Sequence, residues 1–178
     1  SAKVDFFAIG SGVGYFDGTG DYLSIPASSD FDFGTAPYTL ETYVRWSVVG
    51  TSVLFDEAAD KWKIRYQGGH LYFENGSAPW NDVTFTPVAN TWYHIASTRG
   101  ATNALTFING TLSDTDANST NITSTGQINI AIDASGNNGL NGRLDNVRVS
   151  KGIARYQATF NPPEDYSNAR PEGMLAVF

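Results

Sequence analysis

Apolar and polar side chains alternate in short stretches along most of the chain. The clearest stretch covers residues 38–46, where Leu40 and Val44 alternate with Glu41 and Arg45. A period of two places the apolar side chains on one face and the polar ones on the other, which is typical of a half-buried strand. The pattern therefore predicts a strand here, with one face in the protein core.

Turn residues separate this stretch from a series of similar ones. Asn109-Gly110 supplies the two positive-φ positions of a type I′ hairpin turn, and Gly68-Gly69 predicts a second hairpin. The Ser-Ser-Asp-Phe stretch at 28–31 is typical of a single turn of helix with an N-cap. Strands are expected at residues 4–9, 15–16, 21–25, 38–46, 52–55, 61–66, 70–73, 92–98, 104–108, 111–113, 128–132, 143–150 and 175–178, and loops at 78–82 and 114–126. Many short strands without a long helix predict an all-β fold, a two-sheet antiparallel β-sandwich formed by one domain over residues 1–178.

Composition narrows the possible functions. Charged residues make up 16% of the chain and the net charge is −7, with no cluster of Lys and Arg, which argues against nucleic acid and anionic membrane surfaces as partners. The absence of cysteine excludes disulfides and thiolate chemistry. No segment has the apolar length of a membrane-spanning helix, so membrane insertion is not expected. A polar surface with few charges suits a domain that is extracellular, on a cell surface or on a virion.

A series of motifs follows along the chain: YFDGTGDYL at 15–23, YTLETYV at 38–44, TWYHIA at 91–96, FING at 107–110 and GRLDNVRV at 142–149. Together they resemble the laminin-G-like branch of the concanavalin-A-like lectin/glucanase superfamily. The tail at 150–163 is similar to versions in bacteriophage structural proteins and marine bacterial surface proteins. The resemblance implies a concanavalin-A-like jelly roll with one concave and one convex sheet. In many relatives it also implies a calcium ion and a glycan or protein ligand.

The resemblance suggests where calcium would bind. Relatives that hold calcium often bring two regions of this kind together at an edge of the sandwich, the Gly-rich turn with Asp17 and the start of the late strand with Asp145. Asp21 and the carbonyl of Gly18 are further candidate ligands, since calcium needs several oxygen ligands at once. The alternative is that Asp17 is an Asx-turn residue and that Asp145 forms a hydrogen bond at a strand end.

Aromatic residues mixed with polar ones suggest a glycan site in the middle of the sequence. Flat aromatic rings bind the C–H faces of sugars, while amide, carboxylate and guanidinium groups bind the hydroxyls. Trp80 is the leading candidate because the sequence around it predicts a loop, and loops carry variable binding residues. The predicted glycan-binding residues are Trp80, Tyr72, Asn81, Asp82, Arg65 and His70.

Other aromatic residues are better explained by packing. Trp62, Ile64 and Tyr66 alternate along one stretch and are expected to form a buried face. Trp46 and Trp92 are expected in the core as well.

The evidence for catalysis is weak. Glycoside hydrolysis needs a positioned pair of carboxylates, and the Glu-x-Asp-x-(x)-Glu strand motif of the glucanase relatives does not occur. Asp56-Glu57 and Asp60 come nearest, but Ala58-Ala59 interrupts the alternation that would place them on one face. His70 and Tyr72 share a strand face, which resembles polysaccharide lyases of this fold only faintly. We therefore do not expect an enzyme.

These observations predict a non-catalytic carbohydrate-binding or adhesion module of a larger surface or virion protein. Its partner would be an extracellular glycan or a neighbouring surface or virion protein. The alternative is a structural or decoration domain of a phage virion that makes protein–protein contacts. A polysaccharide lyase or glycoside hydrolase ranks last.

Overall fold

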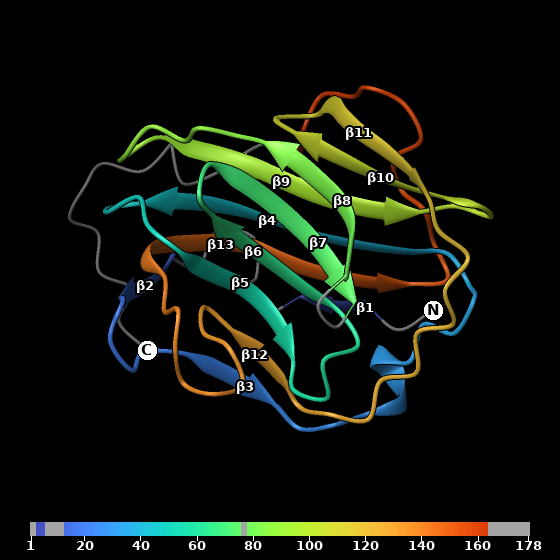
Figure 1. Ribbon diagram of the computed structural model, residues 1–178, viewed down its shortest axis with the longest axis horizontal. Coiled ribbons are helices and arrows are strands. Elements are labelled where there is room, and N and C mark those ends of the chain that lie inside the picture. Colours follow the sequence, from blue (N-terminus) through green and yellow to red (C-terminus); the bar gives the residue numbers. More distant parts are fainter. Residues whose placement is uncertain (1–2, 6–12, 76–77, 164–178) are drawn as a thin grey trace.

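Two antiparallel β-sheets lie face to face around one hydrophobic core (Figure 1). The computed structural model describes residues 3–5, 13–75 and 78–163. The seven-stranded sheet consists, in spatial order, of β1 (Lys3–Asp5), β13 (Asn141–Lys151), β4 (Tyr38–Trp46), β9 (Trp92–Arg99), β10 (Asn103–Ile108) and β11 (Thr111–Ala117), with β2 (Gly14–Asp17) also paired to β13. The six-stranded sheet consists of β3 (Leu23–Ile25), β12 (Ile128–Ile130), β5 (Ser52–Glu57), β6 (Lys63–Gln67), β7 (His70–Asn75) and β8 (Ala78–Thr84). The two-sheet sandwich expected from the sequence is confirmed, and η1 (Ser29–Phe31) is the expected helical turn.

Two segments expected to be loops contain strand: residues 78–82 throughout, and the first part of 114–126. Residues 78–82 belong to β8, where Pro79 is tolerated because β8 is the last strand of its sheet and needs no second set of backbone donors. β11 continues to Ala117, and its polar sequence reflects an edge strand with mostly exposed side chains. Of the strand expected at 4–9, only the part within β1 is described, and the strand expected at 175–178 lies outside the described residues.

Alternating side chains of both sheets fill the core. From β4, Tyr38, Leu40, Val44 and Trp46 are buried. The indole Nε1 of Trp46 donates a 2.8 Å hydrogen bond to the Ser52 hydroxyl of the opposite sheet, so its one polar group is satisfied. The buried face expected for β6 and the residue before it is confirmed, because the core includes Trp62, Ile64 and Tyr66. Each large apolar side chain buried in this way contributes on the order of 2 kcal/mol to stability.

Trp92 is half-buried and lies outside the core, contrary to expectation. It pairs with Arg45 across β9 and β4, and paired residues of neighbouring strands share a face. Arg45 is one residue away from the buried Trp46, so this pair faces outward.

The segment after β13, residues 152–163, covers part of the outer face of the seven-stranded sheet. The rings of Tyr156 and Phe160 stack with their centroids 3.6 Å apart, and Phe160 packs edge-on against Phe107 of β10. The backbone N–H of Phe160 donates a hydrogen bond to the carbonyl of Gly110. Gly110 has a φ of +74°, and a Cβ atom there would lie 2.0 Å from the Phe160 carbonyl oxygen. The Asn-Gly turn expected from the sequence therefore also admits this segment (Figure 1).

The carboxylate of Glu41 anchors the segment to the sheet. Glu41 lies on the outer side of β4 and is only 2% exposed. It accepts hydrogen bonds from the Tyr156 hydroxyl (2.7 Å), from Nε2 of His94 (3.1 Å) and from Nε of Arg148 (2.6 Å). Burial alone would raise the pKa of Glu41, but these hydrogen bonds and the Arg148 charge lower it to about 2. Burial and the neighbouring carboxylate raise the pKa of Tyr156, so its hydroxyl remains a donor.

Replacing Glu41 by Gln removes the charge that these three groups surround. The folded-state pKa of about 2 lies below the ordinary value of 4.5. The ionised carboxylate therefore stabilises the fold above pH 4.5, and this contribution is lost as the pH falls toward 2. We expect Glu41→Gln to lower the free energy of unfolding at pH 7 by about 3 kcal/mol. It should also flatten the acid decline of stability, measured by urea denaturation across this pH range.

Tyr156→Phe is the control, because it removes one hydrogen bond and keeps the carboxylate. It should cost about 1 kcal/mol and leave the acid decline in place. An acid decline in Glu41→Gln as steep as in the unaltered protein would contradict the role assigned to Glu41.

Candidate functional site

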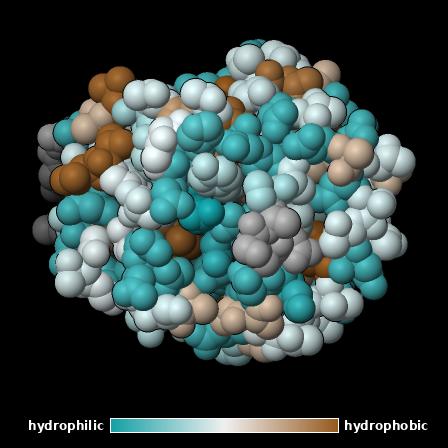
Figure 2. Space-filling model, in the orientation of Figure 1, coloured by the Kyte–Doolittle hydropathy of each residue, from teal (hydrophilic) through white to brown (hydrophobic). Residues whose placement is uncertain are grey.

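The outer face of the six-stranded sheet is polar and is the face turned toward the viewer in Figures 1 and 2. Figure 2 shows that this side is mainly hydrophilic. Apolar side chains of β6, β7 and β8 point into the core, so every second residue of these strands faces outward. The outward positions carry Lys63, Arg65, Gln67, His70, Tyr72, Glu74, Asp82 and Thr84.

Five of these side chains contact one another and form what we call the Tyr72 cluster: Arg65, His70, Tyr72, Glu74 and Asp82. The guanidinium carbon of Arg65 lies 4.8 Å from the centre of the Tyr72 ring. The His70 ring stacks with the Tyr72 ring, with the two centroids 5.7 Å apart, and its Nδ1 lies 2.6 Å from Oδ1 of Asp82. Arg65 also forms a two-pronged ion pair with Glu74, at 2.8 and 3.1 Å. Four residues predicted from the sequence thus meet at one place.

The other two predicted glycan-binding residues lie inside the sandwich. Trp80 is 9% exposed and packs near Tyr38, with ring centroids 6.4 Å apart. Asn81 is fully buried, and its amide donates to Oδ2 of Asp114 at 3.1 Å. The pairing of β7 with β8 shifts between Phe73 and Glu74, and a β-bulge of this kind lets consecutive residues share a side. The expectation that Trp80 lies in a loop is wrong, and its ring offers a ligand little surface.

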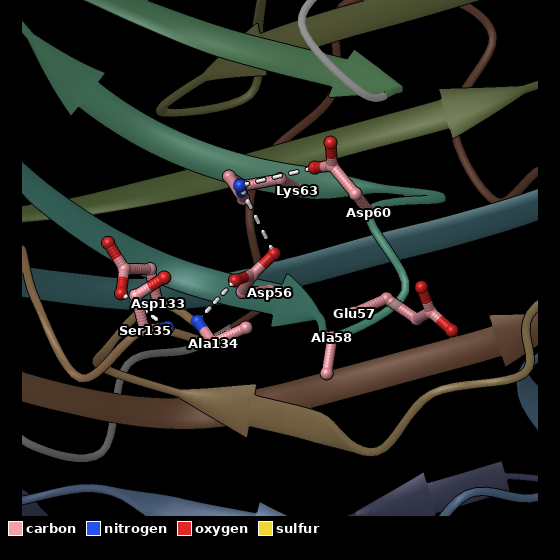
Figure 3. A pocket seen from close by; sticks show the side chains of 8 residues that line it. All are labelled: Asp56, Glu57, Ala58, Asp60, Lys63, Asp133, Ala134 and Ser135. Atoms are coloured by element: carbon pink, nitrogen blue, oxygen red, sulfur yellow. Dashed lines mark hydrogen bonds and ion pairs between the residues drawn. The ribbon is translucent and has the colours of Figure 1, made fainter.

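A pocket of about 270 Å³ opens beside the cluster, where β5 ends and β6 begins (Figure 3). Its lining residues are Asp56, Glu57, Ala58, Asp60, Lys63, Asp133, Ala134 and Ser135. Asp56 is 1% exposed, and its Oδ2 accepts a 2.7 Å hydrogen bond from the Ala134 N–H. The other oxygen, Oδ1, accepts no hydrogen bond and lies 3.4 Å from Nζ of Lys63. Burial raises the pKa of Asp56, against the opposing effects of the Ala134 N–H and Lys63.

The acidic residues of the pocket have different roles. Lys63 lies between Asp56 and Asp60, and these carboxylates raise the pKa of its ammonium group although burial acts to lower it. Glu57 points elsewhere, since its Oε1 accepts hydrogen bonds from the Ser124 hydroxyl and the Thr125 N–H, both at 2.9 Å. Asp56 and Glu57 therefore do not form a carboxylate pair across a substrate-sized space.

In the sequence, Asp56, Glu57 and Asp60 suggest only a weak catalytic run and not the pocket that the structure shows. The signal in the sequence is an acidic residue, Asp56, directly after the apolar run of this strand. In the structure the whole strand is buried, Asp56 included. The loop that brings Asp133 and Ala134 over it comes from a distant part of the chain.

The residues proposed for calcium do not all converge. Oδ1 of Asp17 accepts the Thr19 N–H at 2.6 Å, and Oδ2 of Asp21 accepts the Asp17 N–H at 3.2 Å, so these two carboxylates share one turn with Gly18. Asp17 pairs with Asn141. Asp145 lies four residues further along β13, about 13 Å away at the usual strand rise. One ion cannot take ligands from both at 2.3–2.6 Å.

Asp145 is 8% exposed, and its Oδ1 accepts the Asn146 N–H at 2.7 Å. Within the described ranges, no three Asp, Glu or His side chains are grouped so that they could hold a metal ion. A calcium ion in the turn of Asp17, Gly18 and Asp21 stays a prediction.

Fold and surface together define a lectin-type β-sandwich with an open polar face. The chain belongs to the concanavalin A-like lectin/glucanases superfamily, since the laminin-G-type model of that family matches residues 17–156. The similarity to phage and marine bacterial surface proteins stays a prediction. The sequence matches none of the curated proteins with which it was compared.

Solved structures of other proteins share this fold at low sequence identity. A putative carbohydrate-binding protein from Bacteroides ovatus has a TM-score of 0.66 and 17% identity, over 81% of this chain and 44% of that one. Domain 4 of the extracellular arabinanase AbnA from Geobacillus stearothermophilus, solved with arabinotriose, has a TM-score of 0.61 and 17% identity, over 80% and 77% of the two chains. The mouse laminin α1 domains LG4-5 have a TM-score of 0.59 and 14% identity, over 88% and 48%. This chain thus spans less than half of the Bacteroides protein.

No helix among the described residues has the length and apolar character needed to cross a membrane.

Removing the Trp80 side chain should destabilise the protein. Because the ring is buried in the core, we expect Trp80→Ala to lower the free energy of unfolding by about 3–5 kcal/mol. Tyr72→Ala, on the outer face of the same sheet, should cost less than about 1 kcal/mol. Chemical denaturation of both variants measures this, and equal losses would contradict the placement of the two rings.

The calcium prediction is tested by thermal melts with calcium and with a chelator. An ion that binds only the native state raises the melting midpoint, here by about 5 °C at saturating calcium. Asp17→Asn should abolish the rise, while Asp145→Asn should keep it because Asp145 lies outside the turn. A midpoint that calcium does not change would contradict the site.

Proposed function

We propose that this domain is a non-catalytic carbohydrate-binding module, and that the Tyr72 cluster is its binding surface. The observation that supports this most directly is a half-buried Tyr72 ring set among His70, Arg65 and Asp82 on an open sheet face. A sugar ring can lie with its C–H face on the tyrosine, while the flanking side chains donate to and accept from its hydroxyls. The arrangement needs no movement of the fold.

The rigid surroundings favour binding. Tyr72 lies on the middle one of three hydrogen-bonded strands, between Arg65 and Asp82 in register. Arg65 is held by Glu74 and His70 by Asp82, so the polar groups are oriented before a ligand arrives. Side chains that are already ordered lose little conformational entropy on binding. The carbohydrate ligand named for the AbnA domain and the description of the Bacteroides protein support a similar role here.

We place the module in a larger protein on the outside of a cell or a virion, where an extracellular glycan is the partner. The alternative, a decoration domain of a phage particle, requires a protein contact surface, and the edge of β11 is one terminal strand edge that could take part in such a contact. Asp114 and Asp116 lie along that edge, and charged side chains oppose strand-to-strand association. This observation favours the glycan-binding role.

Screening against a glycan array, followed by calorimetry on the strongest binder, tests the proposal. We expect Tyr72→Ala to weaken binding at least tenfold, because a central aromatic contact commonly contributes about 2 kcal/mol or more. Tyr72→Phe should retain most of the affinity, since it keeps the ring. Tyr15→Ala is the matched control, because Tyr15 is an exposed tyrosine (57%) on β2 of the other sheet.

Two outcomes would contradict this function. One is the absence of binding to every glycan on the array. The other is binding that Tyr72→Ala leaves unchanged, which would move the site to another surface.

A further inference from the structure

Carboxylates outnumber cations where the Tyr72 cluster meets the pocket. The carboxylates belong to Asp56, Asp60, Glu74, Asp82 and Asp133, and the permanent cations to Lys63 and Arg65. A charged ligand lying on this surface would therefore meet a net negative field. The chain as a whole has the same sign, with a net charge of −7.

Both cations already have acidic partners. Nζ of Lys63 lies 3.4 Å from Asp56 and 3.3 Å from Asp60. The guanidinium of Arg65 holds both oxygens of Glu74. A protonated His70 would likewise face Asp82 at 2.6 Å. A ligand carboxylate or sulfate would have to share one of these cations with the carboxylate that it already holds, so the negative charge of the ligand would not be balanced.

The pocket contributes an acceptor for a neutral group. Oδ1 of Asp56 is buried and accepts no hydrogen bond, while the same carboxylate is fixed through Oδ2 by the Ala134 N–H (Figure 3). Its only neighbouring donor among the described residues is the Lys63 ammonium, at a long 3.4 Å. A buried acceptor without a short hydrogen bond is costly, and a ligand hydroxyl entering the pocket could supply one. The Lys63 ammonium beside it can donate to a second oxygen of the same ligand.

The pocket and the ring lie within reach of one short ligand. Asp56 pairs with Lys63 and Lys63 pairs with Glu74, two residue pairs along the strands from the Arg65–Tyr72 pair. Two strand spacings and two residues of rise separate Asp56 from Tyr72, about 12 Å. An oligosaccharide of a few residues can lie on Tyr72 and place a hydroxyl-bearing end against Asp56.

We infer that this surface selects neutral, hydroxyl-rich oligosaccharides and rejects glycans that carry carboxylate or sulfate groups. This specificity rests on the glycan-binding function proposed above. Tyr72 provides the stacking surface, Asp56 accepts a hydroxyl, and the surrounding carboxylates repel anionic sugars. Repulsion of this kind sets specificity against the wrong ligand without adding affinity for the right one.

The experiment uses an array that contains neutral, uronate, sulfated and sialylated glycans. It is followed by calorimetry on the strongest binder and on a uronate oligosaccharide of the same length and linkage. We expect the bound set to be neutral and the uronate to bind at least about tenfold more weakly. Raising the salt concentration should narrow that gap, because salt screens repulsion between exposed charges.

Glu74→Gln provides a gain-of-binding test. The substitution keeps the shape of the side chain and frees Arg65 from its carboxylate, so the ratio of the uronate affinity to the neutral-ligand affinity should rise about tenfold. Asp116→Asn is the charge control: it removes one negative charge from the exposed edge strand β11 of the other sheet, and it should change neither ligand.

The possible failures are distinguishable. Acidic glycans that bind as tightly as neutral ones, with Tyr72→Ala abolishing both, would overturn the charge selection and leave the glycan-binding function standing. If Glu74→Gln and Asp116→Asn changed the affinity for the uronate equally, the selection would also be overturned. The discrimination would then depend on the net charge of the protein and not on this surface. No binding to any glycan would overturn both proposals.

Discussion

The Glu41 carboxylate determines which surface of the sandwich is available. It is buried on the outer side of the seven-stranded sheet, where a lone charge would be costly. Three donors from β9, β13 and the segment after β13 surround it, so the charge and its partners stabilise one another. A charged group can be buried there because these partners compensate it, and removing any one of them would leave part of the charge uncompensated. The interaction holds the 152–163 segment against the sheet.

As a consequence, the two outer faces of the sandwich differ in how far they are covered. Tyr156 and Phe160 cover part of the seven-stranded sheet, and Phe107 lies beneath them. The six-stranded sheet receives no such segment over β6, β7 and β8 in the part of the chain that the structure describes, so its outward side chains can meet a ligand. Those side chains are fixed by one another: Arg65 is ion-paired with Glu74, and His70 contacts Asp82. Among the described residues, the fold thus leaves a pre-ordered polar face over β6, β7 and β8.

The period of two in the sequence was enough to predict the sandwich and most of its strands, because burial of one strand face is a local property of the sequence. It also placed His70 and Tyr72 on one strand face. Arg65 joins them in the structure because the hairpin that turns at Gly68-Gly69 pairs Arg65 with Tyr72. Prediction failed where distant segments meet. Trp80 was expected in a loop because its neighbours are typical of turns, but pairing with β7 makes it part of a strand.

The pocket is a second feature that depends on contacts between distant segments and is therefore not predictable from local sequence. Asp56 and Lys63 are neighbours across one strand pair and could be paired from the sequence once the register was known. The wall formed by Asp133, Ala134 and Ser135 comes from a loop more than seventy residues away in the chain. No local pattern predicts that approach. The separation of Asp17 from Asp145 likewise depends on the register of β2 against β13, which places Asp17 opposite Asn141.

These limits explain why a shared fold says little about a shared ligand. Inward residues such as Ile64 and Leu71 must fit the opposite sheet, whereas outward residues such as Arg65 and Tyr72 can change with little effect on the core. Proteins that keep only 17% identity to this chain can therefore keep the sandwich and alter every side chain on its binding face. What a member of this superfamily binds must be argued from that face. Here the face combines one accessible aromatic ring with cations that carboxylates already hold, and this pairing makes a neutral ligand the one it fits.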